Sequence, residues 1–204
     1  MKKRVPFISL FKNDFFHNYK RYWLICSIFL VGIVAGSLGS SFSASKEVKE
    51  YMDVFLSSFP LQGVAKAEIF KISFMNHLTF FLFLCLSGWH IILFSLGILQ
   101  IFLKGFRIGF TISSLLHFYH FRGLLLSFCA LFPQNAILLP AMTLFIVYQM
   151  NFLFEHRCQS IRKNLNLKNI LISFVFFFFI LLTSLIEGYL IPSMIQLMGN
   201  FFLS

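Results

Sequence analysis

The sequence predicts an all-α, polytopic membrane helix bundle with about five transmembrane helices. Hydrophobic residues make up 58% of the 204 positions and aromatic residues 19%, whereas charged residues make up only 12%. A soluble domain with a solvated surface does not have this composition. The 17 basic and 7 acidic residues stand in short groups beside long apolar stretches. Their distribution therefore indicates membrane topology and excludes nucleic-acid binding.

The first span is expected at residues 22–41, which provide about the twenty residues that a helix needs to cross a bilayer. The preceding segment, 1–21, carries six basic residues opposed by Asp14: Lys2, Lys3, Arg4, Lys12, Lys20 and Arg21. Such an excess places the N-terminus in the cytoplasm. A cleaved secretory signal is the alternative, because "SFSAS" near Ala44 offers small residues for cleavage. The long basic segment and the full-length apolar stretch favour an uncleaved span.

Residues 42–76 form the expected extracytoplasmic loop, in which four lysines balance four acidic residues. Apolar residues recur there at helical spacing, with charges on the opposite side and Pro60 ending the pattern. They are Val48, Tyr51, Met52, Phe55, Leu56 and Phe59. This pattern predicts an amphipathic helix whose apolar face lies on the outer leaflet or docks a partner. Packing on the protein's own spans is the alternative.

The second span is predicted at 78–103, and Lys104 and Arg107 then mark a cytoplasmic turn. The third span, 106–121, is short. We expect a sharp turn near His120 to Gly123, followed by a long fourth segment at 122–154 that returns to the cytoplasm.

The fourth segment contains Pro133, Gln134, Asn135 and Pro140 within an apolar run. Pro133 lacks an amide hydrogen and its ring crowds the carbonyl of residue 129, so a helix break is predicted there. Gln134 and Asn135 can satisfy the backbone groups that the break releases. The break is either a packing kink or part of a midplane site of the kind that transporters build from discontinuous helices.

The basic residues of the loop 155–169 indicate on which side of the membrane the fourth span ends and the fifth begins. Four bases there face one acid, Glu155, so the positive-inside rule places this loop in the cytoplasm. A re-entrant hairpin over 106–132 would leave these bases outside and is therefore disfavoured. The fifth span follows at 170–192, and the uncharged tail 193–204 is expected outside the cell.

Two ionisable residues are candidates for a role inside the membrane, where such groups are costly. His90 is expected near the middle of the second span, and Glu187 near the outer end of the fifth. We expect Glu187 to pair with His117, His120 or Arg122. For each residue, a contact that ties two helices together is the alternative to a functional role.

Small residues recur every four positions in two spans and predict close helix packing. Gly32, Gly36 and Ser40 form one such series, and Gly105 and Gly109 form another. The sequence contains no nucleotide-binding loop, HExxH or GxSxG motif, so the chain is not expected to be an enzyme. No cofactor or metal is expected either, since interfacial histidines such as His117 and His120 need no metal.

Three stretches in combination resemble the stage II sporulation protein M family: "FLKGFRIGFTISSLL" at 102–116, "GLLLSFCALFPQNAILLPA" at 123–141 and "LIEGYLIP" at 185–192. The resemblance covers the chain in order. It implies a multi-pass protein of the septal and engulfing mother-cell membrane that acts in forespore engulfment. It also implies a complex with two peptidoglycan hydrolases, stage II sporulation proteins D and P, for which this chain serves as a non-enzymatic scaffold.

A membrane permease or transport subunit is the alternative function. It would use the predicted break at Pro133 to Asn135, with Glu187 or His90 along the pathway. The small number of intramembrane charges weighs against it. An odd number of spans also cannot divide into two equal repeats.

Overall fold

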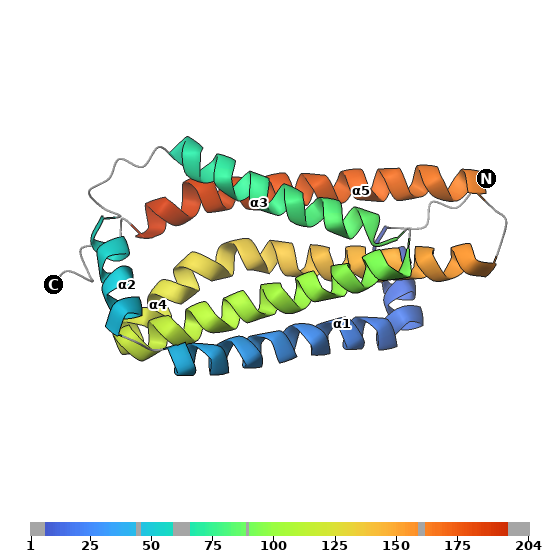
Figure 1. Cartoon of the computed structure of the whole chain (residues 1–204). Coiled ribbons are helices and arrows are strands. Elements are labelled where there is room, and N and C mark those ends of the chain that lie inside the picture. Colours follow the sequence, from blue (N-terminus) through green and yellow to red (C-terminus); the bar gives the residue numbers. More distant parts are fainter. Residues whose placement is uncertain (1–6, 44–45, 59–65, 89, 159–161, 196–204) are drawn as a thin grey trace.

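The computed structural model describes residues 7–43, 46–58, 66–88, 90–158 and 162–195 (Figure 1). Side chains are described at 18–43, 46–51, 53–54, 66–88, 90–153 and 170–195. Within these ranges the chain is helical and contains no strand, which confirms the predicted all-α class. The elements are α1 (Phe7–Ser43), α2 (Lys46–Ser58), α3 (Lys66–Leu86), α4 (Ile91–Cys158), α5 (Arg162–Leu185) and a π-helix, η1 (Ile186–Leu190). An α-helical turn then continues to Ile195.

Helix α4 is a hairpin of two antiparallel arms that turn at His120, as Figure 1 shows in green and yellow. His120 has φ 51° and ψ −129°, so it alone interrupts the helical backbone of α4. A Cβ on Gly123 would collide with the carbonyl oxygen of Leu115, so the two arms approach too closely there for any side chain. The sharp turn expected near His120 to Gly123 is present.

Four helical segments are long and apolar enough to cross a membrane: Asn18–Ser43, Lys66–Leu86, Ile91–Leu153 and Ile170–Ile195. The third is folded back at His120, and each of its arms exceeds the roughly twenty residues that a crossing needs. The described chain thus has room for five crossings.

The expected second span, 78–103, does not exist as one helix, because α3 ends at Leu86 and α4 begins at Ile91. Ser87 donates its backbone N–H to the carbonyl of Phe83 and closes α3. Gly88 lies against Gln149, where a side chain would not fit. Lys104 and Arg107 therefore do not mark a turn. They lie inside the first arm of α4, since residues 91–119 are helical throughout and contain no proline. The expected short span 106–121 is the second half of this arm.

The predicted break at Pro133 is also absent. The second arm continues as a helix through Pro133 and Pro140, and Figure 1 shows it curving gently. Membrane helices tolerate proline where side chains and local adjustments satisfy the backbone. The amide Nδ2 of Asn135 donates to the carbonyl of Leu131 at 2.7 Å within this stretch. The polar residues after Pro133 are thus part of a continuous helix.

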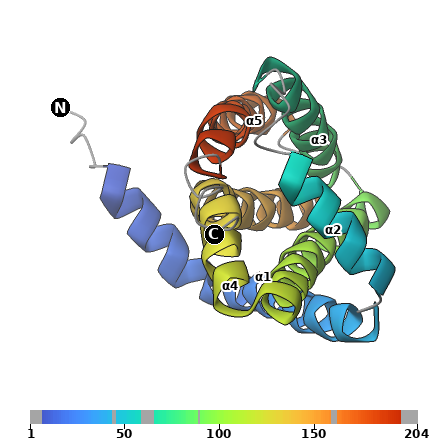
Figure 2. The ribbon, with the colours of Figure 1, turned by 90° about the vertical axis from the view of Figure 1, so that its left-hand side faces the viewer.

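The bundle has two ends, which differ in the elements that meet there (Figure 1). The His120 end holds the α4 turn, the end of α1, the start of α3 and helix α2, which lies across it (Figure 2). The Gly88 end holds the α3–α4 junction, the start of α5 and the end of the second α4 arm. Tyr119 donates a hydrogen bond of 2.6 Å to Asp53 and so ties α2 to the α4 turn.

Helix α1 packs on the first arm of α4 through the small residues that the sequence singled out. A Cβ on Gly32 or Gly36 would overlap the carbonyl of Phe102 or Phe106, and Gly105 and Gly109 meet the backbone of α1 in the same way. The hydroxyls of Ser40 and Ser114 share a hydrogen bond of 2.7 Å. These small residues therefore allow close packing between α1 and the first arm of α4 within one chain.

A second group, α3 with α5 and η1, packs on this layer through aromatic side chains. The rings of Phe145 and Phe176 stack with centroids 4.4 Å apart, and Phe81 contacts both. Ile146 and Ile180 beside them are fully buried. This apolar layer closes the middle of the bundle.

Candidate functional site

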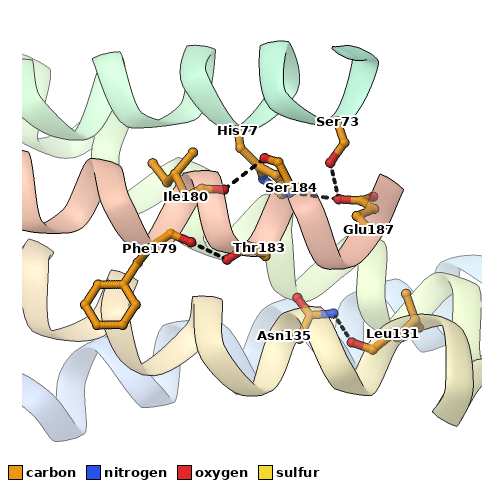
Figure 3. A network of polar contacts seen from close by, with 9 residues as sticks. All are labelled: Ser73, His77, Leu131, Asn135, Phe179, Ile180, Thr183, Ser184 and Glu187. Atoms are coloured by element: carbon orange, nitrogen blue, oxygen red, sulfur yellow. Dashed lines mark hydrogen bonds and ion pairs between the residues drawn. The ribbon is translucent and has the colours of Figure 1, made fainter. Parts of the chain in front are cut away.

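An ion pair lies inside the bundle, toward the His120 end, between α3 and η1 (Figure 3). Ser73 donates its hydroxyl to Glu187 Oε2 at 2.6 Å, and His77 Nε2 lies 2.8 Å from the same oxygen. Ser73 and His77 stand four residues apart, so they share one face of α3. Both are buried, whereas the side chain of Glu187 keeps 32% of its exposure. The carboxylate is thus held by two donors and remains partly accessible.

The π-helical turn Ile186–Leu190 positions Glu187. Gly188 within this turn allows α3 to approach: a Cβ there would lie 2.6 Å from Phe70 Cβ and 2.7 Å from Phe70 Cα. Single π turns inside α-helices are frequent at functional sites. The segment "IEGYL" therefore brings the backbones together and directs the acid toward α3.

Lys104, on the first arm of α4, supplies a third charge. Its ammonium interacts favourably with the Glu187 carboxylate and unfavourably with Arg107. Lys104 lies thirteen residues from Ile91 and fifteen from Tyr119, about 20 Å from either end of the arm. We call Ser73, His77, Lys104 and Glu187 the ionic cluster.

Two further polar groups lie in the bundle core on the second arm of α4. Gln134 and Asn135 are each 6% exposed, and their side-chain oxygens have no hydrogen-bond partner among the described residues. Figure 3 shows Asn135 below the helix that carries Thr183, Ser184 and Glu187. Buried acceptors without a donor are costly in a membrane. They would be satisfied by a water molecule or by a moving donor.

Glu187 differs from expectation in its partners. It pairs with His77 and Ser73 on α3, whereas His117, His120 and Arg122 belong to the α4 turn and its flanks. The sequence does carry a signal for the observed pair, because Ser73 and His77 have the spacing of one helical face. The predicted second span begins at residue 78 and so excludes both Ser73 and His77, which is why the pair was missed.

His90 lies at the start of α4 and not in the middle of a span. It is exposed, and its Nδ1 accepts the backbone N–H of Ile92 at 3.3 Å. Its carbonyl accepts the N–H of Phe94 at 2.9 Å. His90 therefore caps a helix, because α3 ends at Leu86 and α4 begins at Ile91.

The predicted docking face belongs to α2, which forms over Lys46–Ser58 as an isolated amphipathic helix. Tyr51 is 75% exposed and Val48 is partly buried. The side chains of Met52 and Phe55, and all of Phe59, lie outside the described residues. Asp53 faces the α4 turn, so Tyr51, about 200° around the helix, faces away from it.

The family model described as Stage II sporulation protein M matches residues 25–192. The chain belongs to the stage II sporulation protein M family. No curated protein and no solved structure matches it. The family and the apolar helices indicate a membrane protein of sporulation. The match to the stage II sporulation protein M family ends just after η1. It therefore includes all four residues of the ionic cluster.

Proposed function

We propose that this chain is a non-enzymatic scaffold that anchors peptidoglycan hydrolases at the septum during forespore engulfment. Its partners would be stage II sporulation proteins D and P, and its place the septal and engulfing membrane of the mother cell. Membership of the stage II sporulation protein M family supports a role in sporulation. The position of α2 in the fold is the observation that carries the scaffold role.

The proposed topology places α2 on the side of the membrane where the cell wall lies. The Gly88 end carries the basic residues Lys20 and Arg21 at the start of the first span. Arg162, Lys163 and Lys168 at the start of α5 belong to the same end. Positive charge concentrates on the cytoplasmic side of membrane proteins. The His120 end, across which α2 lies, is then extracytoplasmic.

Helix α2 offers a surface suited to a protein partner. Its Asp53 accepts a hydrogen bond from the Tyr119 hydroxyl, which ties α2 to the bundle end. Tyr51 extends away from that bond with 75% of its surface exposed. Tyrosine is enriched in protein interfaces because its ring buries a large area and its hydroxyl finds a hydrogen bond. An extracytoplasmic hydrolase can therefore dock on this face.

Replacing Tyr51 with aspartate tests the docking role in sporulating cells that lack the native copy. We expect the Tyr51→Asp chain to accumulate normally, while fluorescently labelled partner hydrolases lose their enrichment at the septum. Tyr51→Phe is the matched control, since it keeps the ring and should keep recruitment. Septal enrichment of both hydrolases that is equal in the two variants would sink the docking role.

The ionic cluster favours a second candidate function, which is transport across the bundle. Charged residues inside a membrane often mark ion or proton pathways. However, the apolar layer around Phe145 and Phe176 separates this cluster from buried Gln149 near the Gly88 end. A Glu187→Gln variant decides between the two roles: it should abolish transport, whereas a scaffold with normal abundance should still support engulfment.

A further inference from the structure

Arg107 is exposed on the first arm of α4, in line with an apolar stripe. The stripe consists of exposed residues at helical spacing: Ile92, Leu96, Leu99 and Leu103. Within the described chain, the guanidinium of Arg107 makes one hydrogen bond, from Nε to the carbonyl of Leu103 at 3.4 Å. This is a long bond to the preceding turn of its own helix. The charge of Arg107 is left without a carboxylate.

The carboxylate of Glu187 is not the partner of Arg107. It accepts from Ser73, contacts His77 and is attracted to Lys104. Lys104 also repels Arg107, so the nearby ammonium makes it more costly to keep the Arg107 guanidinium charged inside the membrane. Arginine cannot shed its proton to escape this cost. A membrane-embedded guanidinium of this kind pairs with an acid or reaches toward water.

Lipid phosphates are too far from Arg107 to be its main partner. Tyr119 marks the level of α2, through its bond to Asp53, and α2 has the amphipathic character of a helix at the membrane surface. Arg107 lies twelve residues below Tyr119, which is about 18 Å along the arm. It lies sixteen residues from Ile91, about 24 Å from the other end. Either distance exceeds the reach of its side chain.

A second copy of this chain is also a poor partner. Within the described spans, the carboxylate that lies away from the helix ends is Glu187, and its bonds to Ser73 and His77 already engage it. The anion must come from another protein.

We infer that the stripe ending at Arg107 binds a transmembrane helix of a partner protein, and that an aspartate or glutamate within that helix pairs with Arg107. The apolar residues would pack along the partner helix, while the ion pair fixes its depth. Such a pair in a low-dielectric environment is a specificity element, because a helix without the acid leaves the guanidinium buried and unpaired. The identification of the partner as a recruited hydrolase rests on the proposed scaffold function.

Photo-crosslinking of the full chain in its own membrane tests this site. A benzoylphenylalanine residue at Leu103, one turn from Arg107, reports which molecule lies on the stripe. We expect a crosslinked peptide from a partner's membrane span that contains aspartate or glutamate. Arg107→Leu should reduce this product about tenfold, the size expected of an intramembrane polar contact of 1–2 kcal/mol. Arg107→Lys should retain most of it, and exchanging the charges of the pair should restore it.

The same probe at Trp23, on the exposed side of α1, controls for abundance and labelling. Equal Leu103 products from the intact chain and Arg107→Leu would overturn the inference. So would crosslinks confined to lipid, crosslinks confined to a second copy, or a partner span that lacks an acid. A crosslinked partner that carries the acid but is no hydrolase would support the site and count against the scaffold function, so the two fail separately.

Discussion

Replacing Gly188 with alanine should separate η1 from α3 and break the bonds of Glu187. The added Cβ would lie 2.6 Å from Phe70 Cβ, 2.7 Å from its Cα and 2.9 Å from its N. Ordinary carbon contacts need about 3.5 Å or more, so the two backbones must move apart by about 1 Å. The bonds from Ser73 and His77, now 2.6 and 2.8 Å, would then exceed hydrogen-bonding distance.

The expected cost has two parts. Overpacking against backbone atoms costs about 1–3 kcal/mol, and each lost intramembrane hydrogen bond costs about 0.6–2 kcal/mol. Because two hydrogen bonds are lost, Gly188→Ala should destabilise the bundle by roughly 2–7 kcal/mol on these figures. The measurement is the free energy of unfolding of the purified full chain in mixed micelles, titrated with a denaturing detergent.

Gly39→Ala is the matched control, because its Cβ would meet only side-chain rings, those of Phe106 at 3.3 Å and Phe110 at 4.0 Å, and rings can yield. We expect a change within about 0.5 kcal/mol for it. Combining Gly188→Ala with Glu187→Gln should cost less than the sum of the two, since they disrupt the same contact. Equal stability of Gly188→Ala and Gly39→Ala would refute the reasoning.

Three further outcomes are expected. Gly36→Ala should destabilise the bundle by at least about 2 kcal/mol in the same titration, because its Cβ overlaps the carbonyl oxygen of Phe106 on the neighbouring helix; stability equal to that of the intact chain would contradict the close packing. Tyr119→Phe should release α2 and speed amide exchange over residues 46–58 about fivefold, the effect of a bond worth about 1 kcal/mol; unchanged exchange would show that the bond to Asp53 does not hold α2. Pro133→Ala should leave membrane abundance, measured by immunoblot, at the level of the intact chain, because the helix already continues through this position; strong loss would point to a role for the proline ring in packing.

The all-α membrane class could be predicted from the sequence because apolar length and basic flanks are local signals. The position of the turn between the second and third predicted spans could not be predicted. Lys104 and Arg107 look like a cytoplasmic flank, whereas the true turn lies at Ser87 and Gly88, where burial against Gln149 decides. That contact joins residues about sixty positions apart and leaves no periodic trace in the sequence.

Only part of the ionic cluster could be predicted from the sequence, for the same reason. Glu187 stands out as an acid in an apolar run, but its partners come from helix α3 and the first arm of α4. The predicted start of the second span at residue 78 left His77 just before it, and the predicted turn at Lys104 put that residue at the membrane surface. Pro133 shows the opposite error, since a strong local signal for a break was overridden by the continuity of a long buried helix.

The hairpin turn at His120 limits how the molecule can move. A single non-helical residue joins the two arms of α4, and their close approach at Gly123 restricts sliding of one arm past the other. Helix α1, locked to the first arm by Gly36 and Gly109, must travel with them. We therefore expect any displacement within the bundle at the seam between this unit and the α3–α5 pair. The electrostatic attraction between Glu187 and Lys104 acts across that seam, so a shift between the two units would change it.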